Sequence, residues 1–472
     1  MTKRIALSLA VLAATAACNP NTALRPKEQG VVTTIGPQSL DGLYTGAISD
    51  FAVAWSGAGD ESNGGHEGNV GLSAIFTDEL TAAGLDEFEY RRALDNRIAT
   101  SSNQQLAGIF NDLSTSRHSS ELAASSFAKF APKDLGFAEM MALNGYTYVI
   151  FAEMWCSGIP FGELNADGSP HYTLPITTGA MDTIALRKFD SATALAAADT
   201  SGTTILALSQ VGRARVLLNL GFFAAAGKTA DSALATDPIL NYQLENSLNS
   251  PRQYNGVWKF NQGNDAWGVV DRKGGNGLNF ISAQDPRILW EDTHKIGSLG
   301  ETVPGHDTVY YQLKYPTKAS SATLASAVEA TLISAEADLR ASNIPSWAGK
   351  LNALRAASGL TQTFLDTVAT SPSVVVDTII RPLPALGADS TILASDSLRV
   401  EVHFREREFW LWLTGSRLGD LRRLLRQYTG GQWGTHNDFP LNEPGTDIRF
   451  AVPIGETNNP NFKQCADVGN ET

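Results

Sequence analysis

Apolar residues recur every three or four positions over most of the chain, a period that predicts amphipathic α-helices. In residues 104–130, Leu106, Ile109 and Leu113 fall on one face of such a helix. The same period marks four further segments, residues 39–55, 136–155, 181–198 and 207–238. The chain is therefore expected to be mainly α-helical.

Small residues within these segments indicate that the helices pack closely in pairs. In residues 207–238, small side chains leave room for a neighbouring helix and larger apolar ones fill the groove: Ala214, Gly221 and Ala225, then Leu217, Leu220 and Phe223. Residues 324–360 read as a helix, a short turn containing proline and a second helix. Paired hairpins of this kind are typical of repeat arrays. We predict a tetratricopeptide-like helical hairpin scaffold with repeats at about 39–238 and 322–361.

Two stretches interrupt the helical pattern, residues 242–316 and 370–396, and both are loop-rich. Short β-prone pieces at 256–260 and 309–315 are separated by turn signals. We expect these insertions to form an irregular lobe with short β-strands, resting on the helices. Loops held by a rigid scaffold are the usual place for binding.

The first residues predict export. Two basic residues, an apolar run and small residues precede Cys18, which is the pattern of a secretory signal peptide over residues 1–17. This cysteine is typical of bacterial lipoprotein signals, in which Cys18 carries lipid, although Thr15 stands where leucine is usual. Ordinary cleavage with Cys18 left as a thiol is the alternative. Residues 18–38 are then a lipidated N-terminus and tether, and residues 39–472 form the folded body.

Net charge and cysteine content limit which partners and which cellular compartment are expected. The 472 residues carry a formal net charge of -13, and an acidic surface repels phosphate backbones, so nucleic acid is not an expected partner. If Cys18 carries lipid, only Cys156 and Cys465 remain. In an oxidising compartment such a pair suggests one disulfide, and two buried thiols are the alternative.

The sequence carries no recognisable catalytic motif. It contains no HExxH, CxxC, Walker or GxSxG pattern, and the glycines of residues 273–280 lack the strand-then-helix context of a phosphate loop. His66 and Glu67 form an isolated pair that fits loop polarity better than metal ligation. We expect no catalytic residue, no cofactor and no metal site. Calcium binding by oxygen ligands of the glycine-rich loops is the weaker alternative.

The densest charge lies in residues 400–427, VEVHFREREFWLWLTGSRLGDLRRLLRQ. Four apolar residues recur there every seven positions: Phe404, Leu411, Leu418 and Leu425. This period predicts the buried stripe of one C-terminal helix within a helix-and-tail region, residues 398–472. Arg417–Asp420 and Asp420–Arg423 have the spacing of salt bridges within a helix. We interpret the arginines as clamps to neighbouring helices rather than as a phosphate site.

The same segment resembles the signature of the SusD/RagB family of outer-membrane nutrient-binding lipoproteins, loosely E-R-x-R-E-L-x-x-E-G-x-R-x-x-D-L-x-R. Seven residues match it in order: Arg407, Glu408, Gly415, Arg417, Asp420, Leu421 and Arg422. Thr414 replaces the usual acidic residue, and Phe409 the usual leucine. Residues 144–163 and 450–462 resemble an early helix-and-turn motif and the closing motif of the family. The resemblance therefore covers essentially the mature chain.

This resemblance implies a tetratricopeptide-like fold with a loop-rich lobe and a role that requires no catalysis. It implies a lipid-anchored protein at the cell surface of the outer membrane. Such a protein binds oligosaccharides or other nutrient fragments and passes them to a SusC-like TonB-dependent transporter. A polymer-degrading hydrolase on the same scaffold and a purely protein-binding helical-repeat adaptor are the alternatives.

The resemblance assigns no ligand-binding residue, so candidates come from composition. Sugar sites combine exposed aromatic rings with amide and carboxylate groups. In the first insertion the candidates are Tyr254, Trp258, Asn261, Asn264, Asp265, Trp267 and Trp290. Trp55, just before the glycine-rich loop 57–69, is a candidate for another wall. Alternatively, these tryptophans form the small hydrophobic core of the lobe.

Overall fold

The structure is a computed structural model of the whole chain. It describes residues 35–59, 66–83, 89–164, 170–294, 308–357, 361–366, 375–380, 383, 385–386, 395–428 and 439–466. The predicted signal peptide, Cys18 and nearly all of the tether lie outside the described residues, as does much of 370–396. Within the described ranges, no helix is long and apolar enough to cross a membrane.

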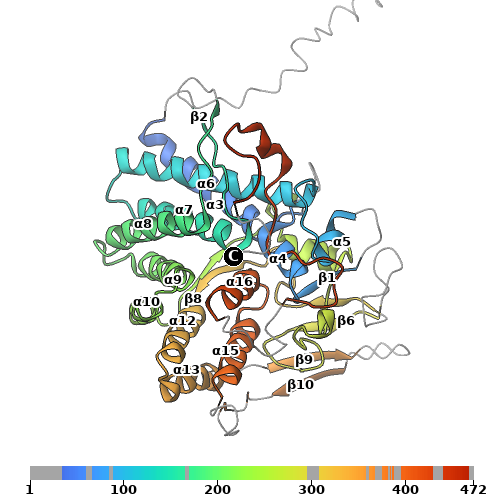
Figure 1. Cartoon of the computed structure of the whole chain (residues 1–472). Helices are drawn as coiled ribbons and strands as arrows, with labels where there is room; N and C mark the ends of the chain where they lie inside the picture. Colours follow the sequence, from blue (N-terminus) through green and yellow to red (C-terminus); the bar gives the residue numbers. More distant parts are fainter. Residues whose placement is uncertain are drawn as a thin grey trace, which may run out of the picture.

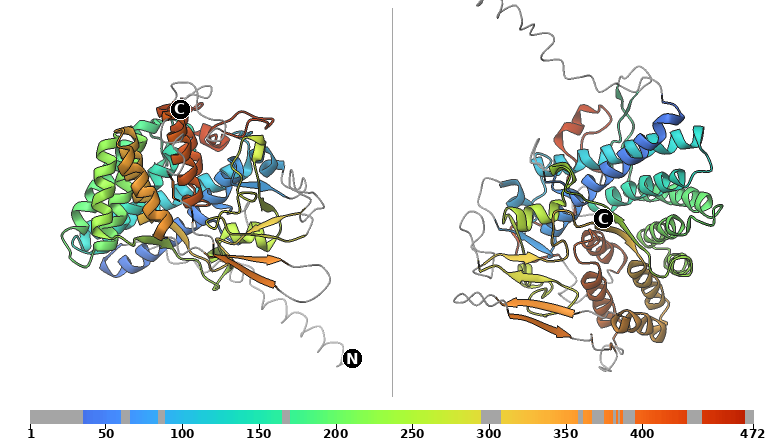
Figure 2. Two further views of the ribbon diagram at one scale, coloured as in Figure 1. Left: turned by 90° about the horizontal axis from the view of Figure 1, so that it is seen from below. Right: turned by 180° about the vertical axis from the view of Figure 1, so that it is seen from behind.

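The scaffold is a curved row of helices packed side by side (Figures 1 and 2). In packing order they are α3 (Leu40–Ser56), α6 (Gln104–Phe130), α7 (Leu135–Met154), α8 (Thr178–Ala196), α9 (Thr203–Asn219), α10 (Phe223–Thr236), α12 (Ala327–Arg340) and α13 (Ile344–Ala357). Consecutive members of this row contact each other. The predicted mainly α, tetratricopeptide-like hairpin scaffold is confirmed.

Polar residues start several of these helices by accepting hydrogen bonds from the free N–H groups of the first turn. The side chain of Asn103 accepts from the backbone N–H groups of Gln105 and Leu106 at the start of α6. Asp134 caps α7 in the same way, and Ser326 caps α12. The helix starts are therefore set locally by the sequence.

Close packing between α10 and α12 depends on small residues, but not on all of those expected. A Cβ placed on Gly227 would lie 2.5 Å from the Cβ of Ala337, so only glycine fits there. Ala214 is buried as predicted. Ala225 is exposed, and Gly221 lies in the turn before α10 with φ 78°, so neither serves helix packing. The interface is displaced along α10 from the predicted position.

Short antiparallel strand pairs join the remaining segments. They are β1 (Leu80–Ala82) with β5 (Trp267–Val269), β2 (Glu163–Leu164) with β3 (Pro170–His171), β4 (Asn241–Leu244) with β8 (Ala322–Ser326), β6 (Trp290–Asp292) with β7 (Tyr310–Gln312), and β9 (Thr361–Asp366) with β10 (Val375–Ile380). In register, Leu80 faces Val269 and Trp290 faces Gln312. The predicted irregular lobe with short strands is thus present beside the helical row (Figure 1).

The lobe also contains short helices. They are α4 (Gly68–Phe76), α5 (Glu89–Asp95), η3 (Pro251–Gln253), α11 (Gly256–Trp258), η4 (Lys259–Gly263) and η5 (Lys273–Gly275), while η1 (Pro37–Ser39) precedes α3. The expectation of a β-strand at 256–260 is wrong, because the side chain of Asn255 accepts from the N–H of Trp258 and starts a helical turn. The strand expected within 309–315 is β7.

The arginine-rich segment forms two helices, α15 (Asp396–Leu411) and α16 (Arg417–Gln427), rather than the single helix expected. Between them Leu413 and Gly415 have φ of 53° and 66°, a left-handed conformation that ends α15. A Cβ on Gly415 would lie 2.8 Å from the Trp55 ring, so the break also allows close approach. The tail that follows contains η7 (Ile454–Asn458).

The tail is fastened to the end of α7. A disulfide joins Cys156 to Cys465 with a Cα–Cα distance of 5.8 Å, linking the two cysteines singled out from the sequence. Beside it, the N–H of Cys156 donates to the carbonyl of Phe450 over 2.9 Å. The tail, α7 and the lobe share one continuous hydrophobic core.

Candidate functional site

Three buried arginines of α15 and α16 each bond to a carboxylate from another element: Arg407, Arg417 and Arg423. Arg417 donates from Nε and Nη2 to the two oxygens of Asp78, over 2.8 and 2.9 Å. Arg423 donates to Glu336 over 2.7 and 3.1 Å and to Asp420 over 2.8 Å. The predicted Asp420–Arg423 pair is therefore present. The expected Arg417–Asp420 pair is wrong, because Arg417 faces Asp78 across the core.

Asp420 lies at the centre of this network. Arg407 donates to its other face over 2.8 and 3.0 Å. Burial alone would raise the pKa of Asp420, but Arg407 and Arg423 together hold that pKa below its usual value. The carboxylate is thus ionised and fully paired, which leaves no charge here for a phosphate.

Arg422 clamps a helix end rather than a carboxylate. Its Nη1 donates to the carbonyls of Ala152, Glu153 and Trp155 over 2.8 to 3.1 Å. These carbonyls close α7, where a positive charge is favoured by the helix dipole. The arginines of the family-like signature therefore bond to groups of the chain itself and form a clamp between elements, which is the arrangement that the sequence interpretation predicts.

Glu408 of the signature is also buried, but it lies against a second carboxyl. Burial raises the pKa of Glu408 well above its usual value, and the neighbouring Glu79 raises it further. Burial likewise raises the pKa of Glu79 to about 7. Because burial and the neighbouring carboxyl both disfavour a second negative charge, the pair favours a protonated form, and the raised pKa belongs to the pair rather than to one residue.

Three of the aromatic and polar candidates in and beside the lobe are wrong as surface contacts. Trp55, Trp267 and Asn261 are each 0% exposed. Trp55 donates from Nε1 to the carbonyl of Thr323 over 3.0 Å, and Asn261 donates to the carbonyl of Trp267 over 2.8 Å. These residues form the core of the lobe, which was the alternative interpretation.

The other five candidates, Tyr254, Trp258, Asn264, Asp265 and Trp290, are partly exposed. The ring of Trp290 packs edge-on against Tyr310 with centroids 5.4 Å apart, and Tyr311 donates from its hydroxyl to Asp265. The ring of Tyr254 lies under Lys318, whose Nζ is 4.5 Å from the ring centre. These residues leave aromatic edges and polar groups at the lobe surface, divided between β6–β7 and η3–α11.

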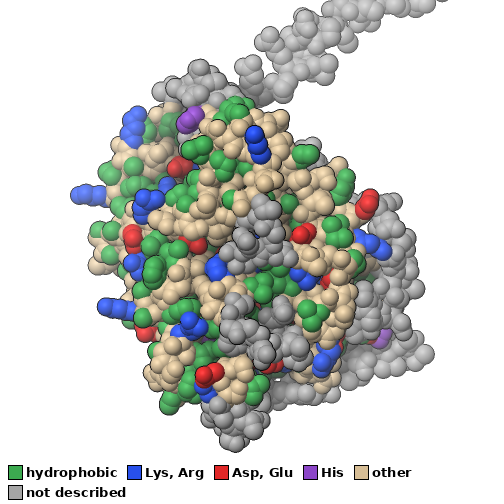
Figure 3. All heavy atoms as spheres, viewed as in Figure 1, with side chains coloured by type: hydrophobic (Ala, Val, Ile, Leu, Met, Phe, Trp, Pro, Cys, Tyr) green, Lys and Arg blue, Asp and Glu red, His purple; other side chains and the backbone are tan. Residues whose placement is uncertain are grey.

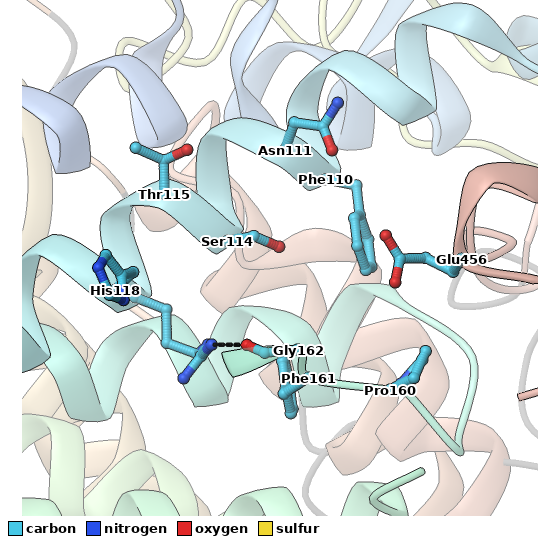
Figure 4. A pocket seen from close by; sticks show the side chains of 10 residues that line it. Phe110, Asn111, Ser114, Thr115, His118, Pro160, Phe161, Gly162 and Glu456 are labelled. Atoms are coloured by element: carbon cyan, nitrogen blue, oxygen red, sulfur yellow. Dashed lines mark hydrogen bonds between the residues drawn. The ribbon is translucent and has the colours of Figure 1, made fainter. Parts of the chain in front are cut away.

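A groove that the sequence did not indicate lies between α6 and the C-terminal tail (Figure 4). Its volume is about 540 Å³. Helix α6 supplies Phe110, Asn111, Ser114, Thr115, Arg117 and His118, and the facing wall consists of Pro160, Phe161, Gly162 and Glu456. Four polar side chains on α6 are spaced three or four residues apart and so form one stripe along the groove.

Arg117 holds one end of the groove in place. It donates to the carbonyl of Gly162 over 3.2 Å, the bond drawn in Figure 4, and to Glu121 over 3.2 Å. Its guanidinium also lies 5.0 Å from the centre of the Phe161 ring. Arg117 is therefore a wall residue whose charge is already balanced.

Glu456 forms the other end of the groove. Its carboxylate points toward Phe110 (Figure 4), and burial raises its pKa above the usual value. Among the described residues that line the groove, it is the one acidic side chain. A half-buried carboxylate of this kind favours ligands that donate hydrogen bonds.

The wall opposite α6 is built by the Cys156–Cys465 connection. Residues 158–164 and 170–176 form the two sides of a hairpin arm, in which Ile159 pairs with Ile176 and β2 with β3. The tail lies along this arm, where Asn459 and Asn461 donate to the carbonyls of Thr173 and Tyr172 over 3.2 and 3.1 Å. The arm and the tail together carry exposed apolar side chains, Tyr172, Leu174 and Ile454.

Sequence reasoning missed this groove for a clear reason. Asn111, Thr115 and His118 are exposed polar residues of an amphipathic helix, which is also the pattern of an ordinary solvated face. The facing wall comes from two segments that are about 300 residues apart and are joined by the disulfide, whose sequence separation is 309. The polar stripe was visible in the sequence, but the wall opposite it was not.

The face shown in Figure 3 carries Lys and Arg side chains that are scattered singly rather than gathered into a basic patch. This view adds no feature of a nucleic-acid interface, which requires clustered positive charge. It agrees with the acidic net charge of the sequence.

The arrangement defines a class before any comparison: a helical-repeat scaffold that carries a loop-rich lobe and a disulfide-fastened tail. No protein-family model matches the chain, and no curated protein sequence does. Solved structures do match, and they include several SusD superfamily and SusD-like proteins. The chain has the SusD-like fold.

Three of these structures show the extent of the likeness. A SusD superfamily protein from Parabacteroides distasonis has 13% identity and a TM-score of 0.63, covering 91% of this chain and 99% of its own. One from Bacteroides thetaiotaomicron has 14% identity and a TM-score of 0.62, covering 90% and 99%. A laminarin-binding SusD-like protein has 13% identity and a TM-score of 0.53, covering 92% and 100%.

Proposed function

We propose that this protein is a nutrient-binding lipoprotein of the SusD/RagB type. It captures oligosaccharides or related nutrient fragments at the cell surface of the outer membrane and delivers them to a SusC-like TonB-dependent transporter. The observation that carries the proposal is the SusD-like fold, shared over 90% or more of the chain with proteins that include a laminarin-binding one. The signature residues around Gly415 and Arg417 support it, because they build the clamp at the centre of this fold.

We propose that the lobe binds ligand through the partly exposed Tyr254, Trp258 and Trp290, with Asn264 and Asp265 as polar partners. Aromatic rings pack against the apolar C–H faces of sugars, and amide and carboxylate groups bond their hydroxyls. Isothermal titration against neutral oligosaccharides, including laminarin fragments, tests this site. The Trp258→Ala/Trp290→Ala double variant is expected to weaken binding about tenfold or more, since each lost aromatic contact contributes up to about 1.5 kcal/mol.

Phe222→Ala is the matched control, because Phe222 is an exposed aromatic residue on the scaffold. It is expected to leave titration unchanged. A double variant that binds as tightly as the native protein would overturn the lobe assignment. Products released from a bound oligosaccharide on long incubation would instead favour a hydrolase.

The membrane and transporter parts of the proposal are tested separately. In cells, Cys18→Ala is expected to release the protein from the outer membrane, because acyl chains supply its anchor. A β-barrel transporter is expected to co-purify with the native protein from detergent-solubilised outer membranes. Membrane retention of the Cys18→Ala protein would contradict lipidation, and purification without any barrel would contradict the partner.

A further inference from the structure

We propose that the groove between α6 and the C-terminal tail is a second, separate saccharide site that holds about two linked pyranose rings. This inference rests on the proposed function, since it assumes that the natural ligand is a saccharide. It assigns a binding role to a surface distinct from the aromatic candidates of the lobe.

Among the residues that the structure describes, the polar stripe of α6 is not used for internal hydrogen bonding. Other serines on the same helix are: Ser119 donates to Asp50, and Ser120 and Ser126 donate to backbone carbonyls of α6. Within the described part of the chain, the side chains of Ser114 and Thr115 make no such bond. The groove thus presents hydroxyls of Ser114 and Thr115 that are available to a ligand, whereas Ser119, Ser120 and Ser126 use theirs within the protein.

The length of the stripe sets the size of the ligand. Asn111 and His118 are seven positions apart in one continuous helix, which corresponds to about 10 Å along the axis. Asn111, Ser114, Thr115 and His118 supply both donors and acceptors over that distance. A disaccharide segment, with hydroxyls at regular intervals along both edges, matches this alternation.

The ends of the groove define the chemistry further. At one end the half-buried Glu456 carboxylate can accept from two adjacent hydroxyls. At the other, Arg117 is balanced by Glu121 and by the Gly162 carbonyl, so it offers no unbalanced charge to an anion. Phe161 and Pro160 supply an apolar wall of the kind that packs against a sugar ring. A neutral, hydroxyl-rich ligand satisfies all of these groups.

The groove is also preformed. The disulfide and the backbone bonds from Cys156 to Phe450 and from Ala466 to Ser157 (2.8 Å) hold the tail against the hairpin arm. Because both segments are fastened, little conformational entropy is lost when a ligand enters, which favours affinity for a small ligand. The exposed ring of Tyr172 on the same arm offers additional contact for a longer chain.

Titration of laminaribiose and neutral tetrasaccharides into three proteins tests the proposal. The native protein is expected to bind two equivalents. Ser114→Trp fills the groove, so this variant is expected to bind one equivalent of saccharide. The Trp258→Ala/Trp290→Ala variant is expected to retain the equivalent that binds in the groove. Glu456→Gln is expected to weaken saccharide binding in the groove about threefold to tenfold, because the amide keeps a neutral hydrogen bond in place of a charge-assisted one. Ser125→Trp, an exposed position on the same helix, is the control and is expected to behave as native.

The outcomes separate this inference from the proposed function. If the Ser114→Trp variant binds as much saccharide as the native protein and the Trp258→Ala/Trp290→Ala variant binds none, the groove inference is overturned and the proposed function stands. If a lysine-rich peptide binds in the groove and saccharides do not, the ligand class is overturned. If folded native protein, checked by circular dichroism, binds no saccharide in the panel, both proposals fail.

Discussion

The arginine-rich α15–α16 segment and the groove beside α6 both gather polar side chains, but they use them differently. In the segment, Arg417 and Arg423 are 1% and 3% exposed, and each is bonded to carboxylates. In the groove, Asn111 and His118 are exposed, while Arg117 is a buried wall residue bonded to Glu121 and to the Gly162 carbonyl. In this protein the densely charged segment α15–α16 therefore joins elements in the interior, and the sparsely charged stripe of α6 lies at the open surface.

The contrast follows from the free energy of burying charge. An arginine without a partner costs several kcal/mol in a protein interior, so buried arginines are found with carboxylates and carbonyls arranged around them. Neutral hydroxyls and amides at a surface carry no such requirement. The buried charges of the clamp must therefore find their partners within the chain, whereas the polar groups of the groove can bond to solvent until a ligand binds.

Removing one side of a buried pair should have the largest effect. Arg417→Ala leaves the Asp78 carboxyl group buried in the core without its bidentate partner, and we expect a loss of about 3 to 5 kcal/mol in the free energy of unfolding. Arg213→Ala removes an arginine whose pair with Asp190 is 32% and 51% exposed, and here we expect less than about 1 kcal/mol. Urea unfolding at neutral pH measures both. Equal losses would contradict the distinction between clamp and surface.

The break between α15 and α16 offers the next largest effect. Gly415→Ala places a Cβ in a left-handed conformation and against Trp55, and we expect a loss of about 2 kcal/mol. Gly349 lies in α13 with nothing within 4 Å of its Cβ position, so Gly349→Ala should stabilise by about 0.5 to 1 kcal/mol. Thermal unfolding of both variants checks the opposite signs. Stabilisation by Gly415→Ala would show that the break is not a constraint.

This break shows how far the sequence can predict the fold. Periodicity placed α3, α6, α7 and α8 within a few residues, because their apolar stripes and caps are local. The seven-residue period across α15–α16 was misleading, because Phe404 and Leu418 reach the same core from two helices. The hydrophobic period alone does not distinguish that from one helix; the local signal of the break was Gly415, a residue type common just after a helix end.

The candidate sites show a similar limit. Tryptophan in a loop-rich stretch was assigned to the surface, yet Trp267 closes the lobe core against Gly71. Asp78 and Glu336, which pair with the signature arginines, stand far from them in sequence, so the partners of the clamp were not predictable. Composition indicates which residues suit a sugar, while tertiary packing decides which of them remain exposed.

Asp182 tests the clamp through pH. It is buried in α8, and burial, followed by the charge of Glu153, raises its pKa to about 7. The folded state therefore holds a proton that the unfolded state has released above about pH 4. This stabilisation is complete in acid and is lost as pH rises through about 7, at up to about 1.4 kcal/mol per pH unit. Asp182→Asn should flatten that slope between pH 5 and 7; an unchanged slope would contradict the raised pKa.

The smallest effect on stability is expected in the groove. Glu456→Gln should change the free energy of unfolding by less than about 0.5 kcal/mol at neutral pH, because this carboxylate faces open space rather than a partner. Glu336→Gln makes the same chemical change where the carboxylate bonds Arg423 and Tyr428, and there we expect a loss of about 3 kcal/mol or more. Urea unfolding of both variants compares the same chemical change in two environments, the open groove and the buried clamp. A loss above about 1.5 kcal/mol for Glu456→Gln would show that this end of the groove is part of the clamp, and the groove would then be structure rather than a vacant site.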